Sequence, residues 1–470
     1  MKAICRALAL ALLLAPAASF AVKIPIPIDG ATLNVSGQFQ TQALLNQNGS
    51  PDGTGPSFDI FMRRTRLLFN GDASQNFTYL LQVDNPNFGK YGNFAVRAII
   101  HDAWVGWAPG GITGGSVLYI DAGILLIPIS HHLLESTTNF VGADVQADAF
   151  RFTNSNYQAL RDTGIQLRGW ALDKKIGFRG GIYEGNTPAA VIIGAGPVTI
   201  NQVSGATTAC TVTPSGTATV AASCLTPKRA PMLGGYVGVD IIGSEEGGWL
   251  YGAYKWGKDP ILSVGVADNY QSLAVRNALN NNLNDQNIFS TDVYLNLPMT
   301  EAAELVFEGT FYKNNNGTNA ANTGIGLSAN LGYRFGKVAA YVAYDYFQAT
   351  DCDATAGGGL TPAQVTTLNT ACAAQAAGAP HSADTREGKI GLNYFFNKNL
   401  NHVNLEFAEN HGQSTYGAGS ITAANAGYAP LVLDPLPGAT ARRAFAGNFP
   451  AGSLRNPSIY SLLLHWNVLF

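Results

Sequence analysis

Apolar and polar side chains alternate at every second residue in many short segments of this chain. In residues 32–43, the odd positions are mostly apolar or small, and every even position is polar, as at Gln38 and Gln40. Residues 460–470 repeat the pattern, with an apolar or aromatic residue at each even position from Tyr460 to Phe470. A period of two is that of a β-strand with one apolar and one hydrated face. The sequence therefore predicts an all-β fold.

The same alternation recurs along most of the chain. It is clearest at residues 65–69, 77–83, 289–297, 338–346, 390–396 and 403–407. About 16 segments are candidate strands, starting near residues 31, 58, 77, 95, 116, 161, 176, 231, 249 or 261, 288, 304, 323, 337, 386, 402 and 458. An even number of strands is typical of bacterial barrels, and about 16 strands enclose an aqueous channel. The segment at 247–262 leaves the exact count open.

Short and long connections alternate between these candidate strands. The short ones are turns at residues 72–76, 173–175, 300–303, 336 and 397–401. The long ones are loops at residues 46–57, 187–230, 271–287, 314–322, 348–384 and 411–455. Turns at one end and loops at the other are typical of a transmembrane antiparallel β-barrel, with the turns on the periplasmic side. We therefore expect one barrel over residues 22–470, with long extracellular loops near 187–230, 348–384 and 411–455.

The composition excludes several other classes of protein. Hydrophobic residues make up 46% of the chain and charged residues 13%, which is about half the charged share of a soluble domain. The formal net charge is −3 and no basic run occurs, which argues against a nucleic-acid partner. No Gly-x-Ser-x-Gly motif joins a strand to a helix, so the sequence predicts neither an enzyme nor a bound cofactor.

The first 21 residues have the features of a secretory signal. Lys2 and Arg6 precede an apolar run at residues 7–14, and small residues lead to Ala21. The apolar run is too short for a membrane helix, which needs about 20 residues. We expect cleavage after Ala21 and export to an oxidising compartment.

Four cysteines lie beyond this signal, which suits an oxidising compartment. Cys210, Cys224, Cys352 and Cys372 allow three pairings. Each neighbouring pair closes a small loop within one irregular segment, which favours the disulfides Cys210–Cys224 and Cys352–Cys372. The alternative is free buried thiols or a zinc site, although neither segment has the spacing of zinc ligands.

Aromatic residues lie at the ends of several candidate strands. Phe470 ends the chain after a strand with alternating apolar residues, which resembles the signal read by the barrel-insertion machinery. Trp104, Trp107 and Trp249 lie at or near strand ends, where aromatic girdles meet the membrane interface. These residues predict insertion into a lipid bilayer, the outer membrane of a Gram-negative bacterium.

Several segments together resemble the phosphate-selective porin O and P family. Residues 61–67 are similar to its arginine-bearing strand, residues 101–107 to its Asp-Ala-aromatic strand, and residues 121–123 to the strand before its third loop. Further similar motifs lie at residues 161–167, 181–185, 292–298 and 391–394. The resemblance implies a 16-stranded homotrimeric barrel, with a third loop folded into the lumen and a constricted pore that favours anions.

The sequence departs from this family where phosphate would bind. Phosphate-binding members place lysines in the constriction, whereas residues 130–159 contain no lysine. The resemblance therefore implies a porin, a passive diffusion channel for small hydrophilic solutes, with an anion preference as a further expectation. The alternative is a barrel that serves as a scaffold or sheath for another outer-membrane component.

Strand parity places several arginines on the hydrated side of the wall. Arg64, Arg66 and Arg168 each alternate with apolar neighbours. An arginine that faces lipid at mid-depth costs about 2–4 kcal/mol, so all three should face the lumen. With Arg151 and Arg161 near the constriction, they would form an electropositive track for anions. In the alternative, they hold the wall or loop in place through ion pairs, with partners among Asp84, Asp102, Asp292 and Glu308.

Three acidic residues lie in the presumed third loop. Glu135, Asp144 and Asp148 would either set a transverse electric field at the constriction or cap turns of the loop. His131 and His132 lie close to Glu135, but zinc needs three or four convergent ligands at fixed geometry. No helical pattern presents these side chains together, so the sequence predicts no metal site.

Overall fold

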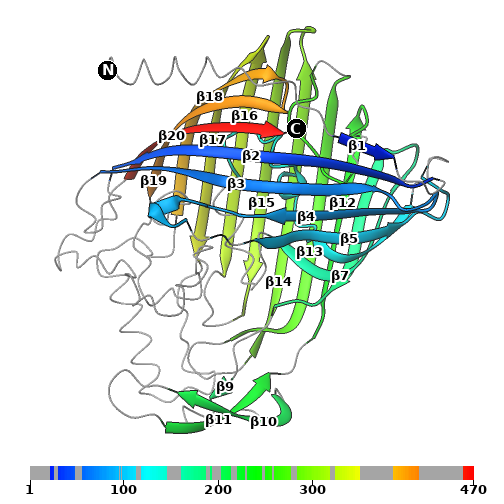
Figure 1. Ribbon diagram of the computed structural model, residues 1–470, viewed down its shortest axis with the longest axis vertical. Coiled ribbons are helices and arrows are strands. Elements are labelled where there is room, and N and C mark those ends of the chain that lie inside the picture. The colour runs from blue at the N-terminus through cyan, green and yellow to red at the C-terminus, as the bar shows by residue number, and fades with distance from the viewer. Residues whose placement is uncertain are drawn as a thin grey trace.

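The barrel wall in the computed structural model is an antiparallel sheet that closes on itself (Figure 1), and the described residues contribute 16 strands to it. The structure describes residues 22–25, 30–47, 56–94, 96, 98–112, 118–145, 160–186, 191–192, 203–212, 220–227, 230–245, 249–256, 259–276, 283–317, 323–349, 385–411 and 459–469. The wall strands are β2 (Thr32–Asn46), β3 (Ser57–Asp72), β4 (Phe77–Asp84), β5 (Ile99–Trp107), β6 (Leu118–Leu126), β7 (Arg161–Ala171), β8 (Ile176–Tyr183), β12 (Met232–Ile242), β13 (Ile261–Arg276), β14 (Leu283–Pro298), β15 (Ala303–Asn315), β16 (Gly324–Phe335), β17 (Val338–Ala349), β18 (Thr385–Asn397), β19 (Asn401–His411) and β20 (Ile459–Leu469). The predicted fold class is confirmed.

The sheet closes where its last strand meets its first. β20 pairs with β2, so that Leu469 lies opposite Gln38, and the red β20 lies directly beside the blue β2 in Figure 1. β8 pairs with β12, with Ile182 opposite Leu233, and this pairing bypasses the strands between them. β1 (Val22–Pro25) pairs with the beginning of β2. A closed sheet leaves no unpaired edge, which is what a bilayer interior requires of a β-structure.

The wall has a polar inner face and an apolar outer face. On β2, Gln38, Gln40 and Gln42 are buried, while Phe39 between them is exposed. The outer face of the other strands is equally apolar, with exposed residues such as Val105, Ile165, Leu167, Ile182, Val237, Val266, Leu327, Leu331, Val342, Ile390, Leu405 and Leu462. This arrangement reverses that of a water-soluble protein, and it is stable where hydrocarbon surrounds the outside.

Short turns gather at one end of the strands and long loops at the other. Tight turns join β3 to β4, β7 to β8, β14 to β15, β16 to β17 and β18 to β19. The link between β12 and β13 lies at the same end but is long, spanning residues 243–260. The sequence left open whether a strand starts at 249 or 261, and the strand is β13, which starts at Ile261; an isolated bridge at Tyr251 precedes it. Within the described residues, no helix is long and apolar enough to cross a membrane.

β3 contains an extra residue that changes which side chains face inward. Arg64 lies opposite Gln40, whereas the next pair along the strands is Met62 opposite Thr41. Arg63 therefore has no partner position on β2, which defines a β-bulge. The bulge lets two consecutive arginines reach the interior.

β5 contains a second bulge of the same kind. Asp102 lies opposite Gln82, and the next pair is Ile100 opposite Val83, so His101 is the extra residue. His101 and Asp102 are both buried. Two consecutive polar residues of β5 thus face the interior, as in β3.

A small separate sheet lies in the long connection between β8 and β12. It consists of β9 (Val191–Ile192), β10 (Val203–Val212) and β11 (Val220–Pro227), drawn below the barrel in Figure 1. Cys210 on β10 lies opposite Ala222 on β11. Cys224, two positions further along β11, is therefore on the adjacent strand but not directly opposite Cys210. The disulfide between them stays a prediction.

Candidate functional site

One segment of the chain connects opposite sides of the barrel wall. We call residues 127–145, between β6 and β7, the inner segment. Asn269 on β13 donates a hydrogen bond to the Pro128 carbonyl at 3.1 Å. Gln40 on β2 donates to the Thr137 carbonyl, also at 3.1 Å. Because β2 and β13 lie on opposite sides of the closed sheet, the inner segment spans the interior between them.

A second segment meets the inner segment from the turn end of the barrel. We call residues 249–256, in the link between β12 and β13, the turn segment. Tyr251 in this segment forms a parallel bridge with Glu135. The Ser136 amide donates to the Tyr251 carbonyl at 3.0 Å. The barrel interior therefore holds two segments that enter from opposite ends and pair with each other.

Two tryptophans predicted for the membrane interface lie inside the barrel instead. Trp104 on β5 is buried, and its ring centroid lies 4.4 Å from that of Trp249 in the turn segment. Trp107 is exposed on the outer face, as an interfacial residue would be. The prediction fails for Trp104 because parity, not distance from the strand end, decides the face, and Trp104 shares the parity of the inward-facing Asp102.

Two adjacent arginines of β3 bind one carboxylate of the inner segment. Arg63 Nε and Arg64 Nη2 each lie 2.6 Å from a different oxygen of Asp144. Burial opposes ionisation of Asp144, but the two guanidinium groups outweigh it and hold the pKa of its carboxyl well below the usual range. Burial, together with Arg63, lowers the pKa of the nearby Lys90 to about 8. Three cationic side chains, Arg63, Arg64 and Lys90, therefore gather at this end of the inner segment.

The other described arginines of the predicted track also bind carboxylates. Each is largely buried and bridges to an acid of the wall. The pairs are Arg66–Asp84 at 2.8 Å, Arg161–Asp102 at 3.1 Å and Arg168–Asp121 at 2.9 Å. Of the acids expected as alternative partners, Asp84 and Asp102 take part, while Asp292 and Glu308 instead contact His131. This geometry fits the alternative in which the arginines hold the wall, and the anion track stays a prediction.

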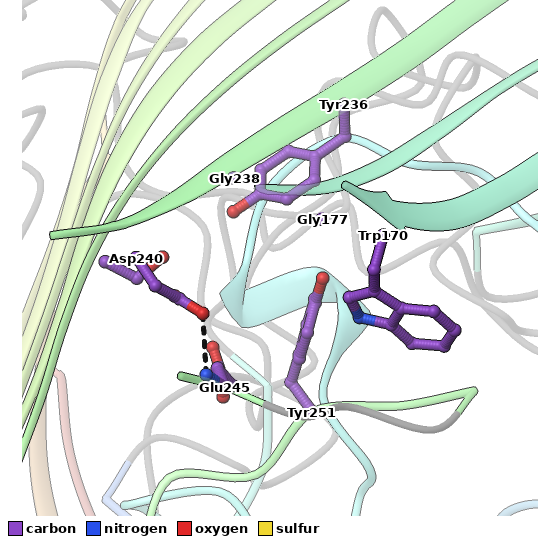
Figure 2. A pocket seen from close by; sticks show the side chains of 8 residues that line it. Trp170, Gly177, Tyr236, Gly238, Asp240, Glu245 and Tyr251 are labelled. Carbon is purple, nitrogen blue, oxygen red and sulfur yellow. Dashed lines mark hydrogen bonds between the residues drawn. The ribbon is translucent and has the colours of Figure 1, made fainter. Parts of the chain in front are cut away.

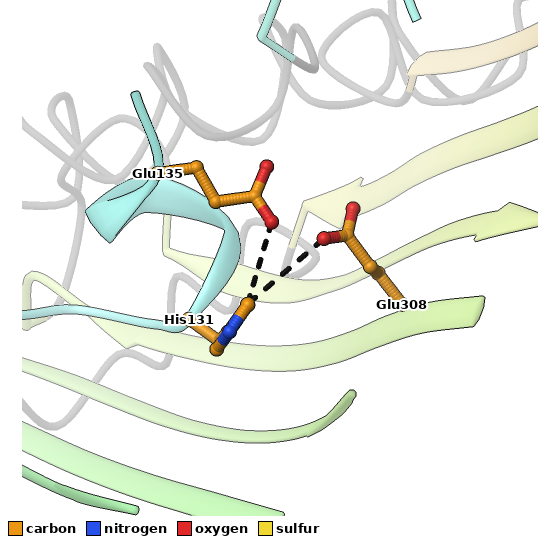
Figure 3. Close-up of side chains that lie close together, drawn as sticks. All are labelled: His131, Glu135 and Glu308. Carbon is orange, nitrogen blue, oxygen red and sulfur yellow. Dashed lines mark ion pairs between the residues drawn. The ribbon is translucent and has the colours of Figure 1, made fainter. Parts of the chain in front are cut away.

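A cluster of histidine and glutamate side chains lies where the inner segment meets β15 (Figure 3). His131 and Glu135 come from the inner segment, and Glu308 comes from β15. His131 Nδ1 and one oxygen of each carboxylate all lie within 4.8 Å of one another. His131 Nδ1 is 3.4 Å from Glu135 Oε1 and 3.9 Å from Glu308 Oε1. His132 Nδ1 lies 3.4 Å from the other oxygen of Glu308.

The ring of His131 is held on both faces and at its far nitrogen. The rings of Tyr251 and Tyr294 stack on it, with centroids 4.7 and 4.4 Å away. Its Nε2 lies 2.7 Å from a carboxylate oxygen of Glu245. Its backbone amide donates to Asp292 on β14 at 2.9 Å. The imidazole therefore has one fixed orientation, with Nδ1 turned toward Glu135.

Burial and charge shift the pKa values of this cluster in opposite directions. Burial alone would lower the pKa of His132, but Glu135 and Glu308 outweigh it and raise it to about 10. Burial opposes the charged form of His131 too, yet Glu245 and Glu135 raise its pKa well above the usual value. Burial and the neighbouring Glu308 raise the pKa of Glu135 to about 7. The carboxylates therefore favour the protonated, positively charged forms of His131 and His132.

A small pocket lies beside Glu245, and Figure 2 shows the side chains that line it. Its lining includes Trp170, Tyr236, Asp240, Glu245, Tyr251 and Ser263. The Glu245 amide donates to the Asp240 carboxylate at 2.6 Å, which fixes the start of the link toward the turn segment. Because Glu245 lines the pocket and also contacts His131, the pocket lies next to the cluster.

Sequence reasoning missed two members of the site. Parity assigns Arg63 to the lipid face, and only the bulge in β3 brings it inward. Glu308 was expected as an arginine partner, and no local signal links β15 to residues 131–135. The expectation that no ligands converge near His131 is wrong, because Glu308 approaches from a strand distant in sequence.

Several predicted residues lie outside the described part of the chain. They are Asp148 and Arg151 of the presumed third loop, Cys352, Cys372, Phe470 and the signal at residues 1–21. The side chains of Cys210 and Cys224 also lie outside it. The roles assigned to these residues stay predictions.

Comparison with known proteins defines the class of fold. No protein-family model matches the chain, and no curated protein matches it in sequence. The structure is similar to an anion-selective porin from Comamonas acidovorans, with a TM-score of 0.50 and 11% identity over 94% of this chain and 100% of that one. It is also similar to Pseudomonas putida OprB, with a TM-score of 0.53 and 9% identity over 93% of this chain and 94% of that one. The chain thus has the fold of the outer-membrane porins.

Proposed function

We propose that this protein is a porin of the outer membrane of a Gram-negative bacterium, a passive diffusion channel for small hydrophilic solutes. The observation that carries the proposal is the reversed sidedness of the wall, with glutamines such as Gln40 inside and residues such as Leu167 outside. Such a wall satisfies its backbone hydrogen bonds within a bilayer and offers a hydrated interior. The similarity of its fold to that of outer-membrane porins supports the proposal.

The inner segment would set the width of the path. It reaches from β2 to β13, so a solute would pass beside it rather than through the full width of the barrel. Selection would then occur by size and charge at this level, without an energy source.

We further propose a preference for anions, because three cationic side chains gather at one end of the inner segment. Arg63 and Arg64 share the single carboxylate of Asp144, and Lys90 lies nearby. The family resemblance in the sequence points the same way. So does the similar fold of an anion-selective porin.

Finer proposals rest on the sequence. The motifs favour membership of the phosphate-selective porin O and P family and a homotrimer. Native electrophoresis and cross-linking in mild detergent test the trimer. Removal of residues 1–21 would make Val22 the first residue of the mature chain, which N-terminal sequencing of the outer-membrane protein tests. The barrel-insertion machinery would recognise the last strand and Phe470.

Recording in planar lipid bilayers tests the channel. The purified protein should insert in ohmic steps, and its reversal potential in a KCl gradient should have the sign of anion selectivity. Folded protein that produces no steps would contradict the channel. A reversal potential of the opposite sign would overturn the anion preference alone.

One observation favours a second candidate, a barrel that acts as a scaffold or sheath. The inner and turn segments pair inside the barrel, and the side chain of Arg64 is only 4% exposed. An interior filled to this extent would conduct little. Silent bilayers, together with protein that fractionates with the outer membrane, would favour the scaffold.

A further inference from the structure

We propose that His131, Glu135 and Glu308 form a binding site for one divalent transition-metal ion of the zinc class. The three donors, one imidazole nitrogen and two carboxylate oxygens, converge within 4.8 Å (Figure 3). The inner segment supplies two of them and wall strand β15 supplies the third. A bound ion would therefore fasten the inner segment to the wall, whether or not the barrel conducts.

The spacing of the donors suits a metal ion better than direct hydrogen bonds. His131 Nδ1 lies 3.4 Å from Glu135 Oε1 and 3.9 Å from Glu308 Oε1. Charge-assisted hydrogen bonds between nitrogen and oxygen are shorter, at about 2.7–2.9 Å. Two ligands of a tetrahedral zinc ion, each about 2.1 Å from the metal, are about 3.4 Å apart. Small side-chain adjustments would bring all three donors to one ion.

Buried oxygen atoms without hydrogen bonds are an independent sign of a ligand. Both carboxylate oxygens of Glu135 and Oε1 of Glu308 are buried. None of these three atoms has a hydrogen-bond partner within the described part of the chain. His131 Nδ1 is likewise buried and has no hydrogen-bond partner among the described residues. Buried polar atoms almost always have hydrogen-bond partners, whereas these carboxylates have long ion pairs to His131 and His132, at 3.4–3.9 Å. These atoms point toward one another in Figure 3.

The surroundings of His131 are those of a metal ligand. A ligating imidazole normally donates its second N–H to a carboxylate, which fixes its tautomer and orientation. His131 Nε2 lies 2.7 Å from Glu245, and Lys255 binds the other oxygen of Glu245 at 2.6 Å. With the proton on Nε2, the lone pair of Nδ1 points to Glu135. Glu245 is thus a positioning residue.

The donor set defines the class of ion. Imidazole is a common ligand of zinc and other divalent transition metals, whereas Mg²⁺ and Ca²⁺ prefer sites built only from oxygen atoms. Glu135 and Glu308 together would balance the charge of one divalent ion. Glu245, which contacts His131, also lines a small pocket (Figure 2).

Metal binding by the purified full chain tests the proposal. The protein, produced without a polyhistidine tag, is stripped with EDTA, dialysed and titrated with ZnCl₂ in detergent. We expect one equivalent of zinc by elemental analysis. Glu308→Gln and Glu135→Gln should each weaken binding by more than about 100-fold, and Glu245→Gln by about 10–100-fold. Glu406→Gln should bind zinc as the wild type does, because this buried wall acid contacts the inner segment at Ala143, outside the cluster.

Two results would overturn the site. One is wild-type protein that retains less than a tenth of an equivalent of zinc. The other is folded Glu308→Gln that binds zinc normally. If the variants fail to fold, X-ray absorption of the zinc-loaded wild type decides. A shell of one imidazole and carboxylate oxygens supports the site, and any other shell refutes it.

Discussion

Asp144 binds two arginines of β3. Arg63 and Arg64 contact different oxygens of its carboxylate, and both bonds are 2.6 Å long. A buried ion pair adds little net stability, but removal of one partner leaves an uncompensated charge at a cost of about 3–5 kcal/mol. Asp144 therefore anchors the end of the inner segment to β3.

The variant Asp144→Asn should lose about 3–5 kcal/mol of unfolding free energy at neutral pH, because the carboxylate that binds Arg63 and the buried Arg64 loses its charge. Chemical denaturation of the folded barrel in detergent measures this loss. A variant as stable as the wild type would contradict the anchoring role. Asp173→Asn, in an exposed turn, is the control and should be neutral.

The wild type and the Asp144→Asn variant should also differ in how their stability responds to acid. The pKa of Asp144 is lowered in the folded state relative to about 3.9 in the unfolded chain. Its contribution is therefore complete above about pH 5 and declines as the pH falls through the folded-state pKa. The stability gap between wild type and Asp144→Asn should be constant from neutral pH to about pH 5 and narrow only in stronger acid.

Arg63 should control ion selectivity more than its neighbour does. Of the two arginines that bind Asp144, Arg63 is the more accessible, with 20% of its side chain exposed against 5% for Arg64, so a passing ion meets it first. The variant Arg63→Gln should move the reversal potential in a KCl gradient toward cation selectivity. Lys398→Gln removes the same charge from an exposed turn and should leave the potential unchanged. An unchanged potential in Arg63→Gln would exclude this residue from selection.

At the scale of elements, the inner and turn segments support each other. The Ala253 amide donates to the Asn139 carbonyl at 3.1 Å, next to a close approach at Gly252. A β-carbon at Gly252 would lie 2.5 Å from the Asn139 side chain. Any side chain at position 252 would therefore have to displace Asn139 from its place between the two segments.

The variant Gly252→Val should separate the two segments and raise the single-channel conductance, because the inner segment loses support on one side. Current recordings at fixed voltage measure the change. Gly388→Val is the matched control, since a β-carbon there would meet nothing within 4 Å. Identical conductance in Gly252→Val and wild type would show that the turn segment does not limit the path.

The strands could be predicted from the sequence, whereas the site could not. β7 and β8 begin at Arg161 and Ile176, where the alternation predicts them, because a period of two is a local property. The contacts of the site are not local. Glu308 reaches His131 from a distant strand, and Arg63 faces inward only because of a bulge that parity alone does not reveal.

At the scale of the whole molecule, stability depends on an apolar belt around the barrel. Leu331 lies near the middle of β16 on the outer face and is 42% exposed. The same face near the end of the strand carries Phe335. Hydrocarbon surrounds Leu331, while Phe335 lies close to the membrane interface.

The variant Leu331→Arg should cost about 2–4 kcal/mol of unfolding free energy in lipid vesicles, because a charge would enter hydrocarbon. Phe335→Arg, near the interface, should cost only about 0–1 kcal/mol. Denaturant titration of protein folded into vesicles measures both values. Equal costs at the two positions would contradict the placement of β16 across the membrane.

The bulge at Arg63 also acts like a frameshift in the pattern of tolerated substitutions. Before it, the even-numbered Phe58 and Ile60 face outward, and after it the odd-numbered Leu67 does. A saturation mutagenesis profile of β3 would therefore change phase at this residue, and deletion of Arg63 would restore a regular alternation while every other side chain of the strand keeps its side of the wall.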